Sequence, residues 1–225
     1  MEDETLCLIK FGDRVHLEAL MNEGAMYFQT IEHFQKLEAD ALRGDPSEGL
    51  SKVFQSALAE VTFTTDDGRK FEFSGKKGTL INTVRMSTNY VTGLHAFCMY
   101  AVTSTNSSSY HVDERVRSGF GDTCVAILNF PAFIDRVQSA VKAAGVGPLE
   151  ADLVEYMDRD VHTGDMGAFR KYRAFEYQSE YRITVATGFK GPWTLKIGPL
   201  HGIAEIGEAA RVNEALTLAA NLLPP

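Results

Sequence analysis

The stretch FEYQSEYRITVAT, residues 175–187, begins with charged and amide side chains and continues as an apolar segment. From Tyr181 onward apolar and polar residues alternate, and this period of two is typical of a β-strand with one buried face. A strand through the whole stretch would place these polar side chains in one row: Glu176, Gln178, Glu180, Arg182 and Thr184. Charged side chains are rarely fully buried unless they form ion pairs or take part in binding or catalysis. The row is therefore a solvated sheet face, a structural ion-pair network or a functional site.

The residue types in this row suit ligand binding. A guanidinium group beside a carboxylate favours the ionised carboxylate, so Arg182 can hold Glu180 in its charged form. The amide of Gln178 can then be directed at a ligand. The alternative is a solvated sheet face with a cross-strand salt bridge, because surface charge on strands is common. Spacing alone leaves both interpretations open.

Composition and charge indicate one soluble globular domain over residues 1–225. The chain is 44% hydrophobic and 23% charged, as is ordinary for such a domain. Its net charge of -8 disfavours broad attraction to nucleic acid or to an anionic membrane, but is compatible with a local basic groove. An acidic N-terminus and the lack of a long apolar run predict a cytoplasmic protein without a membrane span. The cysteines are far apart and lack metal-ligand spacing, which predicts buried, reduced thiols and no metal site: Cys7, Cys98 and Cys124.

The rest of the chain predicts an α+β fold with a mixed, mostly antiparallel sheet and flanking helices. Asp66-Asp67-Gly68 predicts a hairpin turn, because Asp-Gly tolerates positive φ angles. Pro131 predicts the start of a helix, since proline suits the first helical turn. Further strands are expected over residues 6–11, 26–29, 80–86, 93–102, 123–130, 193–197 and 203–206. Further helices are expected after Asp13, after Thr30, and over 149–158 and 212–223.

The tripeptide Gln178-Ser179-Glu180 resembles the Q-x-E motif that heads a late strand in the ADP-ribosyltransferase superfamily. The early order of strand, helix and short strand GAMYFQT is also similar to the entrance of that superfamily's split β-sheet. The resemblance implies an ADP-ribosyltransferase-like fold with NAD as the substrate. It also implies that Glu180 is the catalytic acid and that Gln178 helps to select the acceptor.

The resemblance further implies that basic and aromatic residues hold NAD. Lys10, Arg14 or Arg43 would bind the pyrophosphate, Tyr100 would stack on nicotinamide, and Arg182 would lie beside the catalytic acid. Some relatives of this type grip phosphate with a first-strand arginine, whereas this chain has Lys10, which is a point charge without the bidentate fork. Each residue also has a structural interpretation: Tyr100 as a core ring, Lys10 on an edge strand, and Arg43 paired with a neighbouring acid.

A second resemblance covers roughly residues 6–206. RGDPSEG (43–49) and the later YQSEYRI resemble an uncharacterised bacterial and phage family with an N-D-P-x-E-G-like loop and an E-[WY]-R-[IF] strand. This family carries no established activity.

The expected function is therefore an ADP-ribosyltransferase-like enzyme that uses NAD to modify a protein or nucleic-acid acceptor, as a toxin, a defence effector or a phage counter-defence factor. One alternative is a non-catalytic module that binds a nucleotide or a partner. Another is a metal-dependent nuclease, because carboxylates can together hold a divalent ion: Asp45, Glu48, Glu176 and Glu180. His95, alone on an apolar strand, is expected to be a core histidine.

Overall fold

The chain forms an α+β fold in a computed structural model. The structure describes residues 5–36, 47, 49–79, 82–87, 92–103 and 111–222. For residues 58 and 219–222 it describes the backbone but not the side chains. The strands are β1 (Thr5–Gly12), β2 (Ala25–Thr30), β3 (Lys52–Phe54), β4 (Glu60–Thr64), β5 (Lys70–Ser74), β6 (Val84–Met86), β7 (Leu94–Thr103), β8 (Thr123–Ile127), β9 (Leu149–Leu153), β10 (Glu155–Met157), β11 (Gly164–Asp165), β12 (Arg170–Tyr172), β13 (Glu180–Ala186), β14 (Trp193–Lys196) and β15 (Ala204–Glu208). The helices are α1 (Arg14–Glu23), α2 (Ile31–Lys36), α3 (Glu114–Gly119), α4 (Phe130–Ala144) and α5 (Val212–Leu222), with 3₁₀ helices η1 (Ser56–Leu58), η3 (Arg173–Gln178) and η4 (Ala209–Arg211).

The main sheet has the strand order β14-β2-β7-β1-β8-β15, and β13 pairs with both β7 and β9. Its strand pairs are antiparallel, whereas the small β10–β12 pair is parallel. The prediction of an α+β fold with a mostly antiparallel sheet is therefore confirmed.

The sheet divides along one edge of β7. On its other edge β7 pairs with β13 from Glu180↔Tyr100 to Ala186↔Leu94. On the dividing edge, β1 pairs with residues 100–103 of β7 and β2 pairs with residues 95 and 96. β1 and β2 therefore diverge across residues 97–99, and this divergence positions the site described below.

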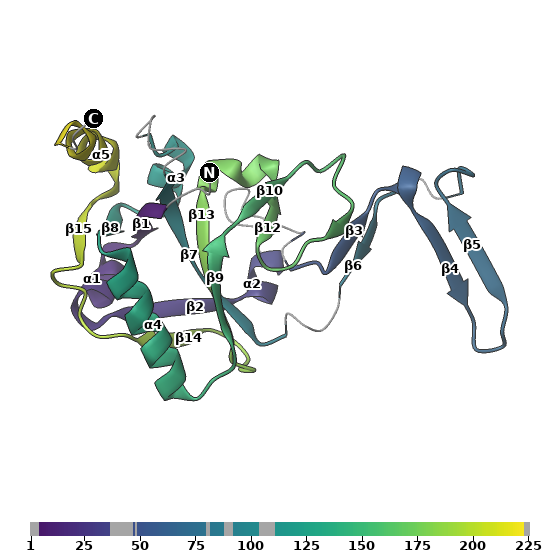
Figure 1. The fold of residues 1–225 in the computed structure, drawn as a ribbon, viewed down its shortest axis with the longest axis horizontal. Coiled ribbons are helices and arrows are strands. Elements are labelled where there is room, and N and C mark those ends of the chain that lie inside the picture. The colour runs from purple at the N-terminus through teal and green to yellow at the C-terminus, as the bar shows by residue number, and fades with distance from the viewer. Residues whose placement is uncertain are drawn as a thin grey trace.

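Two helices cover the hydrophobic core of the sheet. Figure 1 shows α4 in front of the strands, and its buried side chains Phe133, Val137 and Val141 follow the four-residue spacing of one helix face. α1 contributes Leu17, Leu20 and Met21 to the same core cluster. Both helices end in a left-handed glycine, Gly24 and Gly145.

Helix capping follows the sequence only in part. Asn129 Oδ1 accepts a 3.1 Å hydrogen bond from the backbone N–H of Ala132, at the start of α4. Thr30 Oγ1 accepts a 3.2 Å bond from His33 N–H, as expected for a cap of α2. Asp13 occupies the N-cap of α1, but its side chain makes no capping hydrogen bond.

Two predicted elements are wrong, both beside β13. Residues 149–158 form strands β9 and β10 instead of a helix, because β9 completes the free edge of β13. Residues 173–178 form a 3₁₀ helix that precedes the strand, and Ser179 has a positive φ of 38°. Glu176 therefore leaves the row of polar strand residues and is exposed.

The predicted hairpin at Asp66-Asp67-Gly68 is confirmed, and its strands β4 and β5 extend away from the body of the fold (Figure 1). Strand β8 ends at Ile127, earlier than expected, because Phe130 already begins α4. None of the helices in the described part of the chain is long and apolar enough to cross a membrane.

Candidate functional site

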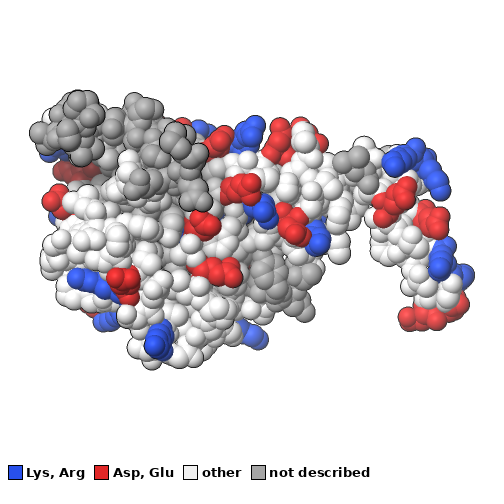
Figure 2. Space-filling model, viewed as in Figure 1, with Lys and Arg blue, Asp and Glu red and all other residues white. Residues whose placement is uncertain are grey.

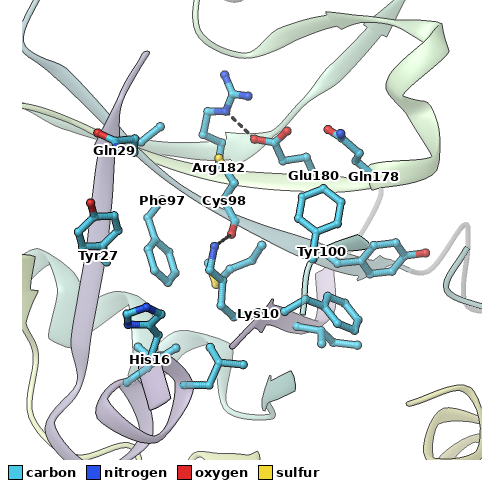
Figure 3. A pocket seen from close by; sticks show the side chains of 18 of the residues that line it. Lys10, His16, Tyr27, Gln29, Phe97, Cys98, Tyr100, Gln178, Glu180 and Arg182 are labelled. Atoms are coloured by element: carbon cyan, nitrogen blue, oxygen red, sulfur yellow. Dashed lines mark hydrogen bonds and ion pairs between the residues drawn. The ribbon is translucent and has the colours of Figure 1, made fainter. Parts of the chain in front are cut away.

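A cavity of about 530 Å³ lies where β1 and β2 diverge from β7. In Figure 3, Tyr27 and Gln29 of β2 lie on one side of this opening, Tyr100 on the other, and Lys10 between them. His16 of α1 lines the cavity as well. The polar end of β13 reaches its wall through Glu180 and Arg182. The cavity is called the split-sheet pocket below.

Lys10 holds a positive charge at the division of the sheet. Its Nζ donates a 2.7 Å hydrogen bond to the carbonyl oxygen of Cys98, in the part of β7 between the two diverging strands. The same ammonium group lies 4.6 Å from the centroid of the Phe97 ring. The bond and the ring together fix the cation at the pocket wall.

Glu180 is a buried, ionised carboxylate. Its Oε1 lies 2.7 Å from Arg182 Nε, and its Oε2 lies 2.7 Å from Lys171 Nζ. Burial acts to raise the pKa of Glu180, but the charges of Arg182 and Lys171 outweigh burial and hold that pKa well below its ordinary value. Its backbone N–H donates a 2.9 Å bond to the hydroxyl oxygen of Tyr156, which fixes the head of β13.

The neighbours of Glu180 are part of the same buried network. Gln178 Oε1 accepts a 2.9 Å hydrogen bond from Lys171 Nζ. Arg182 also donates to the carbonyl oxygen of Ala168, and its side chain is only 1% exposed. The row of polar residues on β13 is therefore not a solvated face. It is an ion-pair network that forms one wall of the split-sheet pocket.

Aromatic rings line much of the remaining wall. Tyr100 is half-buried and packs edge-on against Phe11, with 6.5 Å between ring centroids. Burial is the main cause that raises the pKa of Tyr100, so its hydroxyl is neutral. The aromatic lining residues are Phe11, Tyr27, Phe34, Phe97, Tyr100 and Phe120.

The structure brings together most, but not all, of the site residues predicted from the sequence. Gln178, Glu180, Arg182, Lys10 and Tyr100 all line the split-sheet pocket.

Arg14 is not among the lining residues. It is the first residue of α1, and its guanidinium group pairs on the exposed side with Glu18 at 2.8 Å, one helical turn further. Arg43 lies outside the described residues, as do the acids Asp45 and Glu48 proposed for a metal site. In the described part of the chain, no three His, Cys, Asp or Glu side chains are grouped so that they could hold a metal ion.

Sequence reasoning missed Lys171, the second partner of Glu180. It comes from β12, a separate short strand, so no spacing within residues 175–187 could reveal the contact. The basic run RKYR at 170–173 was the available signal.

His95 is fully buried, and its Nε2 lies 2.7 Å from the carbonyl oxygen of Gly191. The interpretation of His95 as a core histidine is confirmed. The cysteines are free thiols, with Cys124 buried and the other two half-buried. Burial raises the pKa of Cys98 to about 12, and the nearby Glu180 charge adds to this effect.

No protein-family model matches this chain, no curated protein matches it significantly, and no solved structure matches it significantly.

Proposed function

We propose that the protein is an ADP-ribosyltransferase that binds NAD in the split-sheet pocket and transfers ADP-ribose to a protein or nucleic-acid acceptor. The observation that carries the proposal is the ionised Glu180 carboxylate in the wall of a cavity of about 530 Å³. Cavities of about 300–1,000 Å³ are typical of small-molecule sites. The motif around Gln178-Ser179-Glu180 supports the same activity by resemblance.

The charges and rings of the pocket suit a dinucleotide. Lys10, Lys171 and Arg182 supply three cations against the carboxylates of Asp13 and Glu180, although the whole chain has a net charge of -8. A pyrophosphate group would find favourable electrostatics there. Flat aromatic walls such as Tyr27 and Tyr100 offer surfaces on which nicotinamide and adenine can stack.

The proposed chemistry is cleavage of the bond between the nicotinamide nitrogen and C1′ of its ribose. The bonding electron pair leaves with nicotinamide, and the ribose develops oxocarbenium character. An acceptor nucleophile then bonds to C1′ and releases its proton to solvent. Glu180 stabilises this positive charge more in the transition state than in the ground state, through a hydrogen bond from a ribose hydroxyl.

The contacts of Glu180 are compatible with that role. A carboxylate has about four lone-pair sites, so an oxygen that pairs with Arg182 or Lys171 can accept a further hydrogen bond. In this proposal Gln178, whose amide oxygen accepts a hydrogen bond from Lys171, orients the acceptor. In this proposal the protein works in the cytoplasm as a toxin, a defence effector or a phage counter-defence factor.

One specific observation favours a second candidate, a nucleotide-binding module without catalysis. Lys171 and Arg182 already pair with the Glu180 carboxylate. In this alternative the ion-pair network stabilises the wall of a nucleotide-binding pocket, and Glu180 takes no part in a reaction. A nuclease has less support, because Glu176 is exposed near Arg173 while Glu180 is buried between its two cations.

The experiment is transfer of label from radiolabelled NAD to components of a cell extract. Wild type and Glu176→Gln should label the extract, because Glu176 is outside the pocket. Glu180→Gln should lose labelling by at least about a hundredfold, the order of loss found when a charge-stabilising group is removed. Tyr27→Ala is a second variant, since this side chain is 54% exposed and its loss should weaken NAD binding without unfolding the chain. NAD binding without labelling by wild type would favour the binding module.

A further inference from the structure

A second cavity, of about 410 Å³, adjoins the segment that follows β12. Its lining residues come from distant parts of the chain: Arg85 on β6, Asp158 and Arg159 after β10, Tyr172 at the end of β12, Arg173, Ala174 and Phe175 on η3, and Ser47. The proposed NAD site does not use this cavity, which is called the arginine pocket below.

The arginine pocket gathers like charges. Three arginines, Arg85, Arg159 and Arg173, line it, and Asp158 is the acid among its described lining residues. Like charges close together repel one another, so this convergence favours an anion as counter-charge. The carboxylate of Glu176 lies 4.0 Å from Arg173 Nε, and both side chains are exposed.

The arginines of this pocket differ from the mixed charge of the rest of the protein. Figure 2 shows acidic and basic side chains interspersed over the face it displays, without a broad basic surface. The whole chain carries a net charge of -8. A polyanion would therefore be attracted to a restricted basic site rather than to the protein as a whole.

The pocket also offers aromatic surface. The guanidinium carbon of Arg159 lies 5.9 Å from the centroid of the Tyr172 ring, and Phe175 lines the same cavity. Guanidinium forks bind phosphate oxygens in pairs, and rings stack on unpaired bases. Arginines and rings in one cavity are the combination used to bind single-stranded nucleic acid.

One contact links the linings of the two pockets. The Phe175 ring, in the arginine pocket, has its centroid 5.6 Å from Lys171 Nζ. That same nitrogen lies 2.7 Å from Glu180 Oε2, in the split-sheet pocket. A strand bound in the arginine pocket would therefore lie next to the proposed reaction centre.

We propose that the arginine pocket binds single-stranded nucleic acid and presents it as the acceptor of ADP-ribose. The phosphates bind Arg85, Arg159 and Arg173, and a base packs against the half-buried ring of Phe175. Presentation as an acceptor rests on the proposed transferase function, whereas strand binding itself does not.

The test is fluorescence anisotropy of labelled single-stranded DNA and single-stranded RNA of about 12 nucleotides, a length near the upper range of single-strand sites. Three bound phosphates predict a slope of about -2 in a plot of log K against log salt. A variant with Arg85→Ala, Arg159→Ala and Arg173→Ala should bind at least about tenfold more weakly and lose most of that slope. Arg211→Ala, an exposed arginine paired with Glu214 and outside the pocket, should bind like wild type.

Several outcomes would overturn the acceptor assignment. These are the absence of saturable binding to either oligonucleotide, equal binding by the triple variant and wild type, or preference for a phosphopeptide over both oligonucleotides. The three arginines are exposed, so the triple variant should stay folded, which circular dichroism checks. The binding assay contains no NAD. Failure of strand binding with intact release of nicotinamide would therefore reject this inference alone. Strand binding without release of nicotinamide would reject the transferase, and with it presentation as an acceptor, but would leave strand binding itself supported.

Discussion

The ammonium nitrogen of Lys171 lies 2.7 Å from Oε2 of Glu180, and the two side chains are only 6% and 5% exposed. This contact ties β12 to the head of β13 and places a paired charge in the wall of the split-sheet pocket. Arg182 adds a second cation on the other carboxylate oxygen. The network is therefore both a structural element and the centre of the proposed site.

Replacement of Glu180 should destabilise the fold. Glu180→Gln removes the buried carboxylate charge that lies 2.7 Å from both Lys171 Nζ and Arg182 Nε, so both buried cations lose that ion pair. Breaking a buried ion pair from one side typically costs about 3–5 kcal/mol. Glu176→Gln, at an exposed position, should change the free energy of unfolding by less than about 0.5 kcal/mol. Urea unfolding of both variants measures the difference, and equal free energies would contradict a stabilising network.

The same pair should make stability depend on acid pH. The pKa of Glu180 is lowered in the folded state from an ordinary value of 4.5, so its contribution is present above that pH and is lost as the pH falls below it. The gap in Tm between wild type and Glu180→Gln should narrow from about pH 6 to about pH 3. A gap in Tm for Glu180→Gln that stays constant or widens in acid would show that the pKa is not lowered.

Alanine in place of glycine should destabilise the fold far more in the turn between α1 and β2 than at the end of α4. Gly24 and Gly145 have similar φ angles of 66° and 65°, so alanine at either position costs about 1–2 kcal/mol in backbone strain. A Cβ at Gly24 would also lie 2.1 Å from the carbonyl oxygen of Gly198, whereas nothing lies within 4 Å of one at Gly145. Thermal unfolding should show Gly24→Ala as the more destabilised variant by at least about 2 kcal/mol. Equal losses of unfolding free energy in the two variants would mean that Gly24 does not lie this close to the Gly198 carbonyl.

Lys10 should matter for NAD binding more than Arg14 does. Lys10→Met keeps the apolar stem but removes the charge at the division of the sheet, so the Kd for NAD should rise about tenfold, or about 1.4 kcal/mol. Arg14→Met removes a charge that pairs with Glu18 on the exposed side of α1. Its Kd should stay within about twofold of wild type. Titration calorimetry measures both, and a larger effect at Arg14 would place the pyrophosphate elsewhere.

Local patterns predicted much of the fold. Alternation in residues 180–186, the Asp-Gly turn and the helix that includes Pro131 each depend on neighbours in sequence, and each is present. Residues 149–158 were predicted as a helix because nothing local shows that β13 has an edge for β9 to fill. Such non-local pairing overrides local propensity.

The candidate site was predicted only in part for the same reason. Glu180 and Arg182 are two residues apart on one strand, so their contact could be anticipated from the period of the strand. Lys171 comes from another strand, and Lys10 meets the carbonyl of Cys98 from 88 residues away. The buried state of the network depends on these distant partners and could not be deduced from charge alone.

The most direct test of the account is the rate at which the protein releases nicotinamide from saturating NAD when cell extract supplies the acceptor. Chromatography measures this rate, and the rate of the extract alone is subtracted. The account predicts release by wild type and by Glu176→Gln. It predicts a kcat at least about a hundredfold lower for Glu180→Gln, with a KM for NAD that changes much less, because Glu180 acts on the transition state. Release by folded Glu180→Gln at the wild-type rate, or no release by wild type above the spontaneous rate, would contradict it.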